Sequence, residues 1–437
     1  MDHFHFQDGR LFCEQVDLEK LADHVGTPTY VYSRATLEDH YDRLAEAFAP
    51  LEPVICYAVK SCDNLSILAL LTHRGAGMDV VSGGEILRAR AAGADMSKVV
   101  YAGVGKTDDE IDLALDEKIG YFNIESEAEF DNIADIARRK GVTARAALRI
   151  NPDVDPRTAH AKTTTGRKES KFGVDIERAR RFFAARGGDE HLKLCAVHMH
   201  IGSPVYQVEP YVHATKRMLT LVEQLQGEGH HIEAIDIGGG FGADYQTDQT
   251  PAYADYARQI VPLLKPFKDG GGQVFIEPGR TISANAGILL TRVLYIKEGG
   301  SKTFAIVDTG MHHLLRPTLY EAFHFIWPAK VEPAMAPPSR GELDMPGLTK
   351  VDVVGPICET GDYLALGRKL PPLKRGDLLA VFAAGAYGRV MASNYNSMPR
   401  PAEVLIHGDE ANLVRRRETW DELLAPETNP HPVLLGS

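Results

Sequence analysis

Four short apolar runs of the sequence are followed by residues whose types could do chemistry. These residues are Lys60, His200, the glycines Gly238, Gly239 and Gly240, and the segment containing Glu277, Gly279 and Arg280. A charged lysine at the end of a buried run is costly, so it must be paired, neutral or covalently used, for example in a Schiff base. The alternative for Lys60 is a side chain that extends past the end of the run to solvent.

The glycines at 238–240, together with Gly279 and Arg280, could hold an anion. Backbone N–H groups that carry no side chain let a phosphate approach closely. A glycine triplet alone indicates only a tight turn. Its position after the seventh strand of a predicted barrel favours a phosphate site, because barrels often bind phosphate there.

His198 and His200 are two residues apart on a predicted strand, so their side chains face the same way. With Glu277 as a third ligand they could bind a metal ion. The same residues could instead serve a flat ring cofactor, with His200 stacked on the ring and Glu277 paired with a ring nitrogen. The composition of the whole site favours the cofactor over the metal.

The elements that position these residues alternate between short β-branched runs and helical stretches from about residue 50 to residue 280. The predicted strands are Val54–Lys60, Met78–Ser82, Val99–Gly103, Tyr121–Glu125, Ala146–Asn151, Cys195–His200, Ile235–Gly240 and Val274–Gly279. Between them, Ser82–Ala92 and Ser126–Arg139 have helical spacing behind a capping serine. Eight such units predict a closed (β/α)8 barrel, whose active site lies at the carboxyl ends of the strands.

Outside the barrel, the sequence changes to period-2 strands after residue 290. The predicted strands are Leu289–Ile296, Thr303–Asp308, Leu348–Val354 and Leu378–Ala383. Tyr30–Ser33 could join either part, and Met335–Pro346 is predicted to be a loop of the second part. We expect a barrel at 36–285 and a mostly-β domain made of 1–35 and 286–437. The polar stretch Asp153–Gly173 is expected to be an exposed loop at the barrel mouth.

The composition excludes several classes of protein. The 437 residues carry a formal charge of −12, with a pI near 5.8, so a nucleic-acid partner is not expected. No apolar run approaches the roughly 18 to 20 residues of a membrane span, and the start lacks a signal peptide, so we expect a cytoplasmic protein. The five cysteines are interpreted as thiols, because their spacing fits neither disulfides nor a zinc cluster.

Motifs along nearly the whole chain resemble one known family. They are YAVK at 57–60, DVVSGGE at 79–85, GVGKT at 103–107, HAK at 160–162, KFGV at 171–174, HIGS at 200–203, DIGGGFG at 236–242, EPGR at 277–280, RPTLYEA at 316–322, GPICETGD at 355–362, GAYG at 385–388 and NYNSMPRPAEVL at 394–405. They are similar to those of the alanine-racemase-like (fold type III) pyridoxal-phosphate enzymes, and within these to the diaminopimelate decarboxylases. The resemblance implies pyridoxal 5'-phosphate as cofactor, no metal, and an amino acid as substrate.

The resemblance also implies roles for individual residues. Lys60 would hold the cofactor as a Schiff base, His200 would stack on its ring, and Glu277 would pair with its ring nitrogen. The glycines at 238–240 and Gly279 with Arg280 would hold the phosphate, and Arg280 would also reach a substrate carboxylate. Tyr387 would contact phosphate or substrate.

Arg316 and Tyr320 match the diaminopimelate pattern, in which a guanidinium binds the carboxylate at the far end of the substrate. A surface salt bridge is the alternative for Arg316. Cys358 would donate a proton, and Glu359 would contact the distal end of the substrate. By the resemblance both come from a second subunit, so the working unit would be a homodimer. For Cys358 the alternative is a small buried apolar residue.

The implied reaction is the release of CO2 from meso-diaminopimelate to give lysine, the last step of lysine biosynthesis. Three alternatives stay open: a sister decarboxylase of ornithine, arginine or lysine, a racemase of the same fold, and a non-catalytic relative. A non-catalytic relative is disfavoured, because such proteins commonly lose the lysine or the cysteine, and both are present here.

Overall fold

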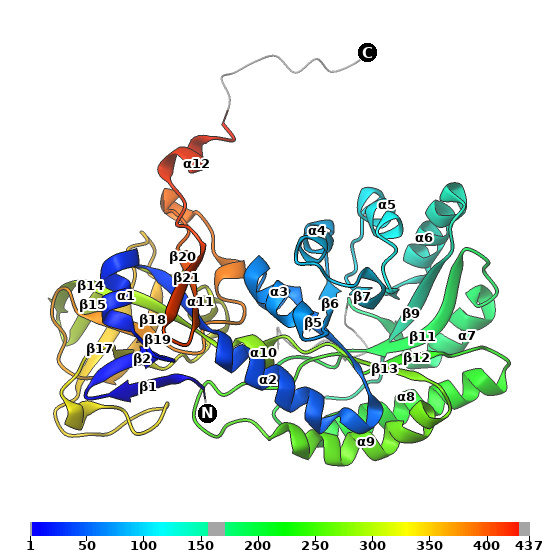
Figure 1. Cartoon of the computed structure of the whole chain (residues 1–437), viewed down its shortest axis with the longest axis horizontal. Helices are drawn as coiled ribbons and strands as arrows, with labels where there is room; N and C mark the ends of the chain where they lie inside the picture. Colours follow the sequence, from blue (N-terminus) through cyan, green and yellow to red (C-terminus); the bar gives the residue numbers. More distant parts are fainter. Residues whose placement is uncertain (1, 156–170, 428–437) are drawn as a thin grey trace.

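A computed structural model describes residues 2–155 and 171–427, and it contains two sheets of nine strands each and a small one of three. Figure 1 shows a barrel with its helices beside a mostly-β region. The HAK motif and most of the predicted loop Asp153–Gly173 lie outside the described residues.

All eight predicted barrel strands are confirmed. In spatial order they are β9 (Ala144–Asn151), β11 (Leu192–Met199), β12 (Ala234–Asp236), β13 (Gln273–Ile276), β5 (Val54–Ala58), β6 (Gly77–Val80), β7 (Val99–Tyr101) and β8 (Tyr121–Ile124). The barrel closes because β8 pairs with β9, and every pairing between these strands is parallel. A two-residue strand, β10 (Val174–Asp175), adds to β9.

Most strands end one to four residues before their predicted ends. The chain leaves the barrel wall at the polar or glycine-rich positions, so the residues proposed for chemistry lie just beyond the strands. Lys60, for example, follows β5 in a short 3-10 turn, Val59–Ser61.

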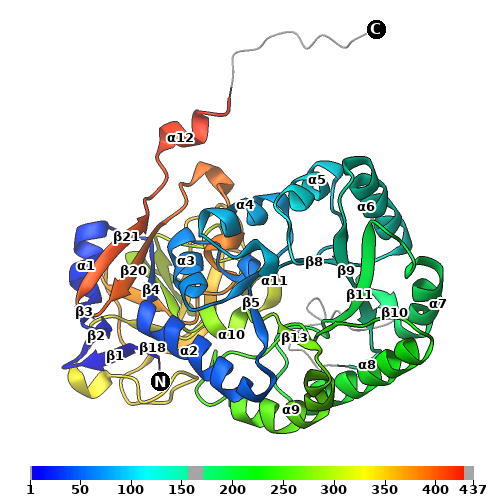
Figure 2. The ribbon, with the colours of Figure 1, turned by 45° about the vertical axis from the view of Figure 1, so that its right-hand side comes forward.

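Helices cover the outside of the barrel, as Figure 2 shows. They are α3 (Leu65–His73), α4 (Gly83–Ala91), α5 (Asp108–Asp116), α6 (Glu127–Lys140), α7 (Ile176–Arg186), α8 (Glu209–Gly227) and α9 (Tyr253–Asp269). The capping serines predicted for two of them are confirmed: Ser82 accepts the N–H of Glu85, and Ser126 accepts that of Glu129.

The four predicted strands of the second part are confirmed as members of the other large sheet. They are β14 (Gly287–Gly299), β15 (Lys302–Val307), β17 (Thr349–Val354) and β19 (Leu378–Val381). Strand β4 (Thr29–Ser33) lies between β14 and β20 (Ala402–His407), so the Tyr30–Ser33 run joins this sheet and not the barrel wall.

Several further elements were not predicted. They are β1 (Phe4–Gln7), β2 (Arg10–Cys13), β3 (Val16–Asp17), α1 (Leu18–Val25), α2 (Arg34–Ala47), α10 (Arg280–Ser283), α11 (Arg316–Tyr320), β16 (Ile326–Pro328), β18 (Tyr363–Leu370), β20, β21 (Glu410–Arg415) and α12 (Trp420–Leu424). Strand β21 has no fully buried residue, so its sequence lacks the apolar alternation by which strands are recognised.

A buried ionic network joins the second sheet to the barrel. Glu403 on β20 is fully buried and accepts hydrogen bonds from Tyr32 at 2.9 Å and from Asn64 at 3.0 Å. Arg415 on β21 forms an ion pair with the same carboxylate and a second one, at 3.1 Å, with Asp63. The segment that follows Lys60 is therefore tied to the β-region.

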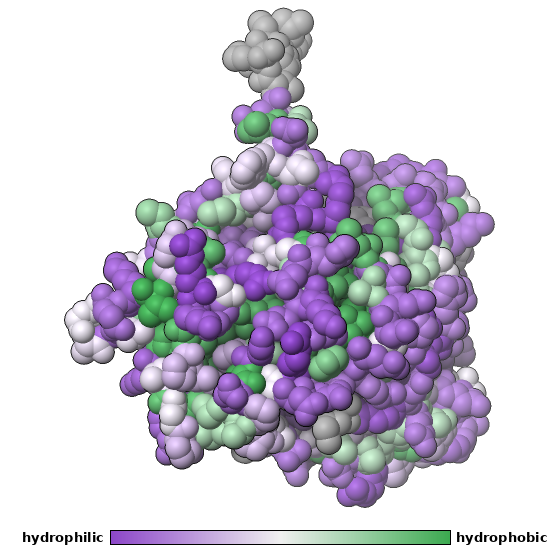
Figure 3. All heavy atoms as spheres, turned by 60° about the vertical axis from the view of Figure 1, so that its left-hand side comes forward, coloured by the Kyte–Doolittle hydropathy of each residue, from purple (hydrophilic) through white to green (hydrophobic). Residues whose placement is uncertain are grey.

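On the face in Figure 3, hydrophilic side chains predominate and apolar areas lie between them. Within residues 2–155 and 171–427, no helix is long and apolar enough to cross a membrane. All five cysteines are described and all are free, which confirms that they are thiols.

Candidate active site

Lys60 lies at the carboxyl end of β5, and its ammonium donates a hydrogen bond to Asp79 on the neighbouring strand β6. About 36% of the Lys60 side chain is exposed, whereas Asp79 is buried. Burial lowers the pKa of Lys60, but the negative charges of Asp79 and Glu277 outweigh it and raise that pKa above its ordinary value. Burial raises the pKa of Asp79 to about 6. The lysine is thus a paired cation at the barrel mouth.

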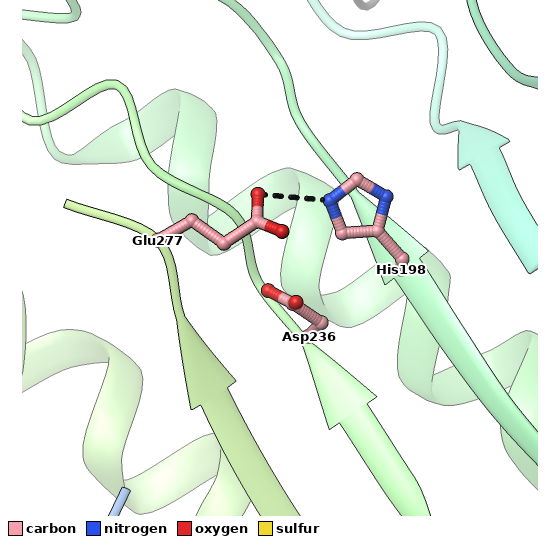
Figure 4. Close-up of side chains that lie close together, drawn as sticks. All are labelled: His198, Asp236 and Glu277. Carbon is pink, nitrogen blue, oxygen red and sulfur yellow. Dashed lines mark hydrogen bonds and ion pairs between the residues drawn. The ribbon is translucent and has the colours of Figure 1, made fainter. Parts of the chain in front are cut away.

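Glu277 follows β13 and is held by two side chains from other barrel strands. His198 Nε2 lies 3.1 Å from Glu277 Oε2 (Figure 4). Asn123 Nδ2 donates to Glu277 Oε1, also at 3.1 Å. Burial alone would raise the pKa of Glu277, but His198 and Lys60 lower it below its usual value. The site therefore contains a buried, oriented carboxylate anion.

Asp236 lies beside this pair, at the end of β12. Its Oδ1 accepts the N–H of Gly238 at 2.8 Å, and burial together with the charge of Glu277 raises its pKa well above the ordinary value. Ligand-type atoms of His198, Asp236 and Glu277 lie within 4.8 Å of one another. This set differs from the metal site considered from the sequence, which required His200.

His200 is oriented by the glycine turn. The N–H of Gly239 donates to His200 Nδ1 at 3.2 Å, and burial lowers the pKa of the imidazole to about 3, so the ring is neutral near pH 7. A Cβ on Gly239 would lie 2.0 Å from the carbonyl oxygen of Glu277. At Gly240, where φ is +97°, a Cβ would lie 2.1 Å from the carbonyl oxygen of Gly202. Only glycine fits this turn, which brings backbone N–H groups to the strand ends.

Arg280 and Arg316 converge on one phenol. Arg280 Nη1 donates to the hydroxyl of Tyr245 at 2.7 Å, and Arg316 Nη1 donates to it at 2.9 Å. Both arginines are buried, so a surface salt bridge is wrong for Arg316. Within the described part of the chain, neither guanidinium is paired with a carboxylate, and Nε of Arg316 is a buried donor with no hydrogen-bond partner. Such a pair of cations calls for an anionic ligand.

Tyr387 connects this cation pair to the lysine turn. Its backbone N–H donates to the carbonyl of Ser61 at 2.8 Å, and its ring lies 4.7 Å from the guanidinium carbon of Arg280. Arg280 Nε also donates to Ser203 Oγ, at 3.0 Å, in the loop that follows His200. Tyr320, the last residue of α11, is partly buried one helical turn from Arg316.

Cys358 and Glu359 lie on an exposed loop, apart from the buried residues around Glu277. The N–H of Cys358 donates to Asn396 at 2.9 Å, and the hydroxyl of Tyr395 donates to Glu359 at 2.8 Å. The exposed thiol agrees with the predicted polar setting and not with a buried apolar role. Asp362 anchors the loop by accepting the N–H groups of Met311 and Ile357. No described contact joins either residue to Lys60 or Glu277 within one chain.

The arrangement fits pyridoxal phosphate. Lys60 offers an amine, His200 a neutral aromatic face and Glu277 an anion for a ring nitrogen. The Cβ positions of Gly239 and Gly240 are occupied by neighbouring carbonyl oxygens, so the packing of the turn itself requires these glycines.

Sequence reasoning missed several residues that the structure brings into this site. Asp79, Asn123, Asp236 and Tyr245 contact the predicted residues directly. Asp79, Asn123 and Asp236 are polar residues inside otherwise apolar strands, and that pattern could have revealed them. Tyr245 has no comparable signal, because it lies in a loop.

A closed barrel with a lysine turn, a glycine cradle and a buried carboxylate defines a class of pyridoxal enzymes. Residues 34–284 match the family described as "Pyridoxal-dependent decarboxylase, pyridoxal binding domain". The chain also belongs to the diaminopimelate decarboxylase family. It is 47% identical to the diaminopimelate decarboxylase of Pseudomonas aeruginosa, over 98% of this chain and 99% of that protein. With the enzyme of Aquifex aeolicus it is 43% identical over 97% of each chain.

Solved structures agree with this assignment. The diaminopimelate decarboxylase of M. jannaschii has a TM-score of 0.90 and 36% identity, with 98% of each chain covered. The Helicobacter pylori enzyme, complexed with L-lysine, has a TM-score of 0.86 and 37% identity, with 94% of this chain and 99% of that chain covered.

Proposed function

We propose that this protein decarboxylates meso-2,6-diaminopimelate to L-lysine and carbon dioxide, with pyridoxal 5'-phosphate as cofactor. The observation that carries the proposal is the convergence of Arg280 and Arg316 on one buried point next to the lysine turn. Diaminopimelate has a carboxylate at its far end, whereas ornithine, arginine and lysine have a cation there. A doubly cationic pocket favours the first and repels the others.

We assign to the cofactor residues the roles expected from the sequence. Lys60 would bind the aldehyde carbon, His200 would pack on one face of the ring, and Glu277 would hold a proton on the ring nitrogen. The glycines at 238–240, with the backbone of Gly279 and Arg280, would bind the phosphate. Bound pyridoxal phosphate supplies an electron sink for the pair that the departing carbon dioxide leaves on Cα.

The substrate residues act at the two ends of the molecule. Arg316 and Arg280 orient the distal carboxylate, with Tyr320 and Tyr387 beside them, and thereby fix the position of the scissile bond at the other end. After the Cα–carboxylate bond breaks, Cα must gain a proton. The thiol of Cys358 is assigned as the donor, and Glu359 as the contact for the distal amino group.

We also propose that the working unit is a homodimer in which each subunit lends Cys358 and Glu359 to the site of the other. Their exposure on an anchored loop, without a described contact to Lys60 in the same chain, supports this assignment. The proposed division is a barrel at 36–285 and a β-domain of 1–35 with 286–437, supported by the pairing of β4 with β14 and β20. The expected compartment is still the cytoplasm, in keeping with five free thiols.

The test is to assay the purified holoenzyme with meso-diaminopimelate, ornithine, arginine and lysine, and to measure carbon dioxide and chiral products. We expect gas and L-lysine from diaminopimelate and at least about a hundredfold lower kcat/KM for the others. Gas from another diamino acid only would identify a sister decarboxylase. Interconversion of enantiomers without gas would identify a racemase.

A spectrum tests the cofactor separately. The wild-type protein should show a visible absorbance band that borohydride removes and that Lys60→Ala lacks. A protein that stays colourless after addition of pyridoxal phosphate would refute the assignment.

A further inference from the structure

Tyr245 occupies a position that none of the roles above explains. It lies in the loop after the glycine turn, yet its hydroxyl oxygen is the point at which Arg280 and Arg316 meet, with N–O distances of 2.7 and 2.9 Å. Arg280 begins α10, which follows the last barrel strand, and Arg316 begins α11 in the β-region. One phenol therefore joins two parts of the fold.

The two guanidiniums repel each other, and their burial makes this repulsion strong. Tyr245 offsets it in two ways. Its oxygen accepts a hydrogen bond from each cation, and its ring lies 4.7 Å from the guanidinium carbon of Arg316 and 5.9 Å from that of Arg280. Burial would raise the pKa of the phenol, but the two arginines outweigh it and lower that pKa. The phenol is thus the group that holds the cations together before a ligand arrives.

Tyr245 is itself fixed in place. Its side chain is buried, and its ring packs edge-on against His324 at a centroid distance of 5.5 Å. Its backbone N–H donates to the carbonyl of Ala243 at 3.1 Å. A rigid bridge of this kind reduces the ordering cost that a ligand would otherwise meet when it binds both arginines.

We propose that Tyr245 is a specificity-determining positioning residue that holds Arg280 and Arg316 as a paired receptor for the distal carboxylate of the substrate. It acts through the arginines and not by contact with the reacting atoms. This inference rests on the proposed function for the identity of the substrate. The paired receptor itself requires only a carboxylate on a chain of suitable length.

Tyr245→Phe tests the proposal, because it removes the bridging oxygen and keeps the ring. In the full-length holoenzyme we expect KM for diaminopimelate to rise at least about tenfold while kcat changes less than about threefold. The inhibition constant of L-lysine, which keeps the distal carboxylate when the other carboxylate leaves as carbon dioxide, should rise by a similar factor. Tyr206→Phe is the matched control, because the hydrogen bond described for its hydroxyl goes to a backbone carbonyl, that of Ala243 at 3.4 Å, and not to either arginine.

Binding of pimelate separates this proposal from the proposed function. Pimelate has the carbon skeleton and both carboxylates of diaminopimelate but no amino group, so its calorimetric binding requires no turnover. Tyr245→Phe should bind pimelate at least about tenfold more weakly than the wild type does. Unchanged or tighter binding would overturn the role of Tyr245, whether or not the wild type releases carbon dioxide from diaminopimelate.

The cofactor provides the remaining check. Pyridoxal phosphate should titrate the apoprotein of Tyr245→Phe with the same dissociation constant as the wild type. An equal loss of affinity for the cofactor and for pimelate would show that Tyr245 supports the pocket as a whole, and would refute a role in specificity.

Discussion

The ammonium of Lys60 donates a hydrogen bond to the carboxylate of Asp79, which is buried at the end of the adjacent barrel strand. The pair has consequences for reactivity, because only a neutral amine attacks an aldehyde. Asp79 stabilises the ammonium form and raises the pKa of Lys60. Asp79 therefore keeps Lys60 protonated in the apoprotein and lowers the fraction of the reactive, neutral amine.

Asp79→Asn should make Lys60 more reactive in the apoprotein. Without the anion, burial dominates and the pKa of the lysine falls. The rate at which an amine reagent labels Lys60 at pH 7 should rise by about tenfold or more, since a pKa shift of one unit is a tenfold change in the neutral fraction. Peptide mass spectrometry would follow the labelling. Asp79→Glu, which keeps a carboxylate, should stay close to the wild-type rate, and an unchanged rate in Asp79→Asn would contradict the prediction.

Asp236→Asn and Glu277→Gln should have very different effects on catalysis, although each variant removes one carboxylate. Burial and the charge of Glu277 raise the pKa of Asp236 well above its ordinary value, which favours the neutral form, and an amide oxygen can still accept the N–H of Gly238. Its variant should keep cofactor affinity and kcat/KM within about threefold. Glu277→Gln removes a buried anion and should lower kcat by about a hundredfold or more. Enzyme kinetics and cofactor titration would measure both variants. Similar losses of activity and cofactor affinity in the two would show that Asp236 is needed as an anion.

The barrel was predictable because its signal is local. Each strand is a short apolar run with a polar or glycine stop, and the stops gave Lys60, His200 and Glu277. The second sheet was predicted only in part. Its strand β21 is exposed, and β18 contains three charged or glycine positions in a row, Gly367-Arg368-Lys369, so neither shows a clear alternation.

The contacts within the site could not be predicted in the same way. Tyr245, Arg280 and Arg316 are brought together by tertiary structure across two sheets, and nothing in the spacing of these residues encodes it. His198 illustrates the intermediate case. The sequence marked it as a possible ligand, but only the fold shows that its partner is Glu277 and that His200 turns to the glycine loop.

Glu403→Ala should destabilise the fold strongly. The variant leaves Arg415, Tyr32 and Asn64 without their shared acceptor in a buried setting. We expect a loss of about 3 kcal/mol or more, seen as a fall of several degrees in melting temperature. Glu410→Ala, at an exposed position of the neighbouring strand β21, is the control and should lie within about 0.5 kcal/mol of the wild type. Equal melting temperatures for both variants would show that the network contributes nothing.

His324 should contribute to instability in acid. Burial and the charge of Arg316 lower its pKa to about 3, whereas an unfolded histidine titrates near 6.5. Between these values the unfolded state binds one more proton at this site, so stability falls as the pH falls through this window. Between pH 7 and pH 5 the wild type should lose about 2 kcal/mol more than His324→Gln, whose amide does not titrate. Urea unfolding at both pH values would measure this, and parallel losses would contradict it.

Two inactive variants should restore activity when they share a dimer. Lys60→Ala lacks the amine and Cys358→Ala lacks the assigned proton donor, so each homodimer should be inactive. In a mixed dimer, one of the two sites combines Lys60 of one subunit with Cys358 of the other. Random assembly makes half of the dimers mixed, so about a quarter of the wild-type activity should return. The matched control is Lys60→Ala mixed with Glu277→Gln, in which every site keeps one defect and no activity should return. Native mass spectrometry would first show that mixed dimers form. If the mixture of Lys60→Ala and Cys358→Ala then regains no activity, Cys358 does not act across the interface.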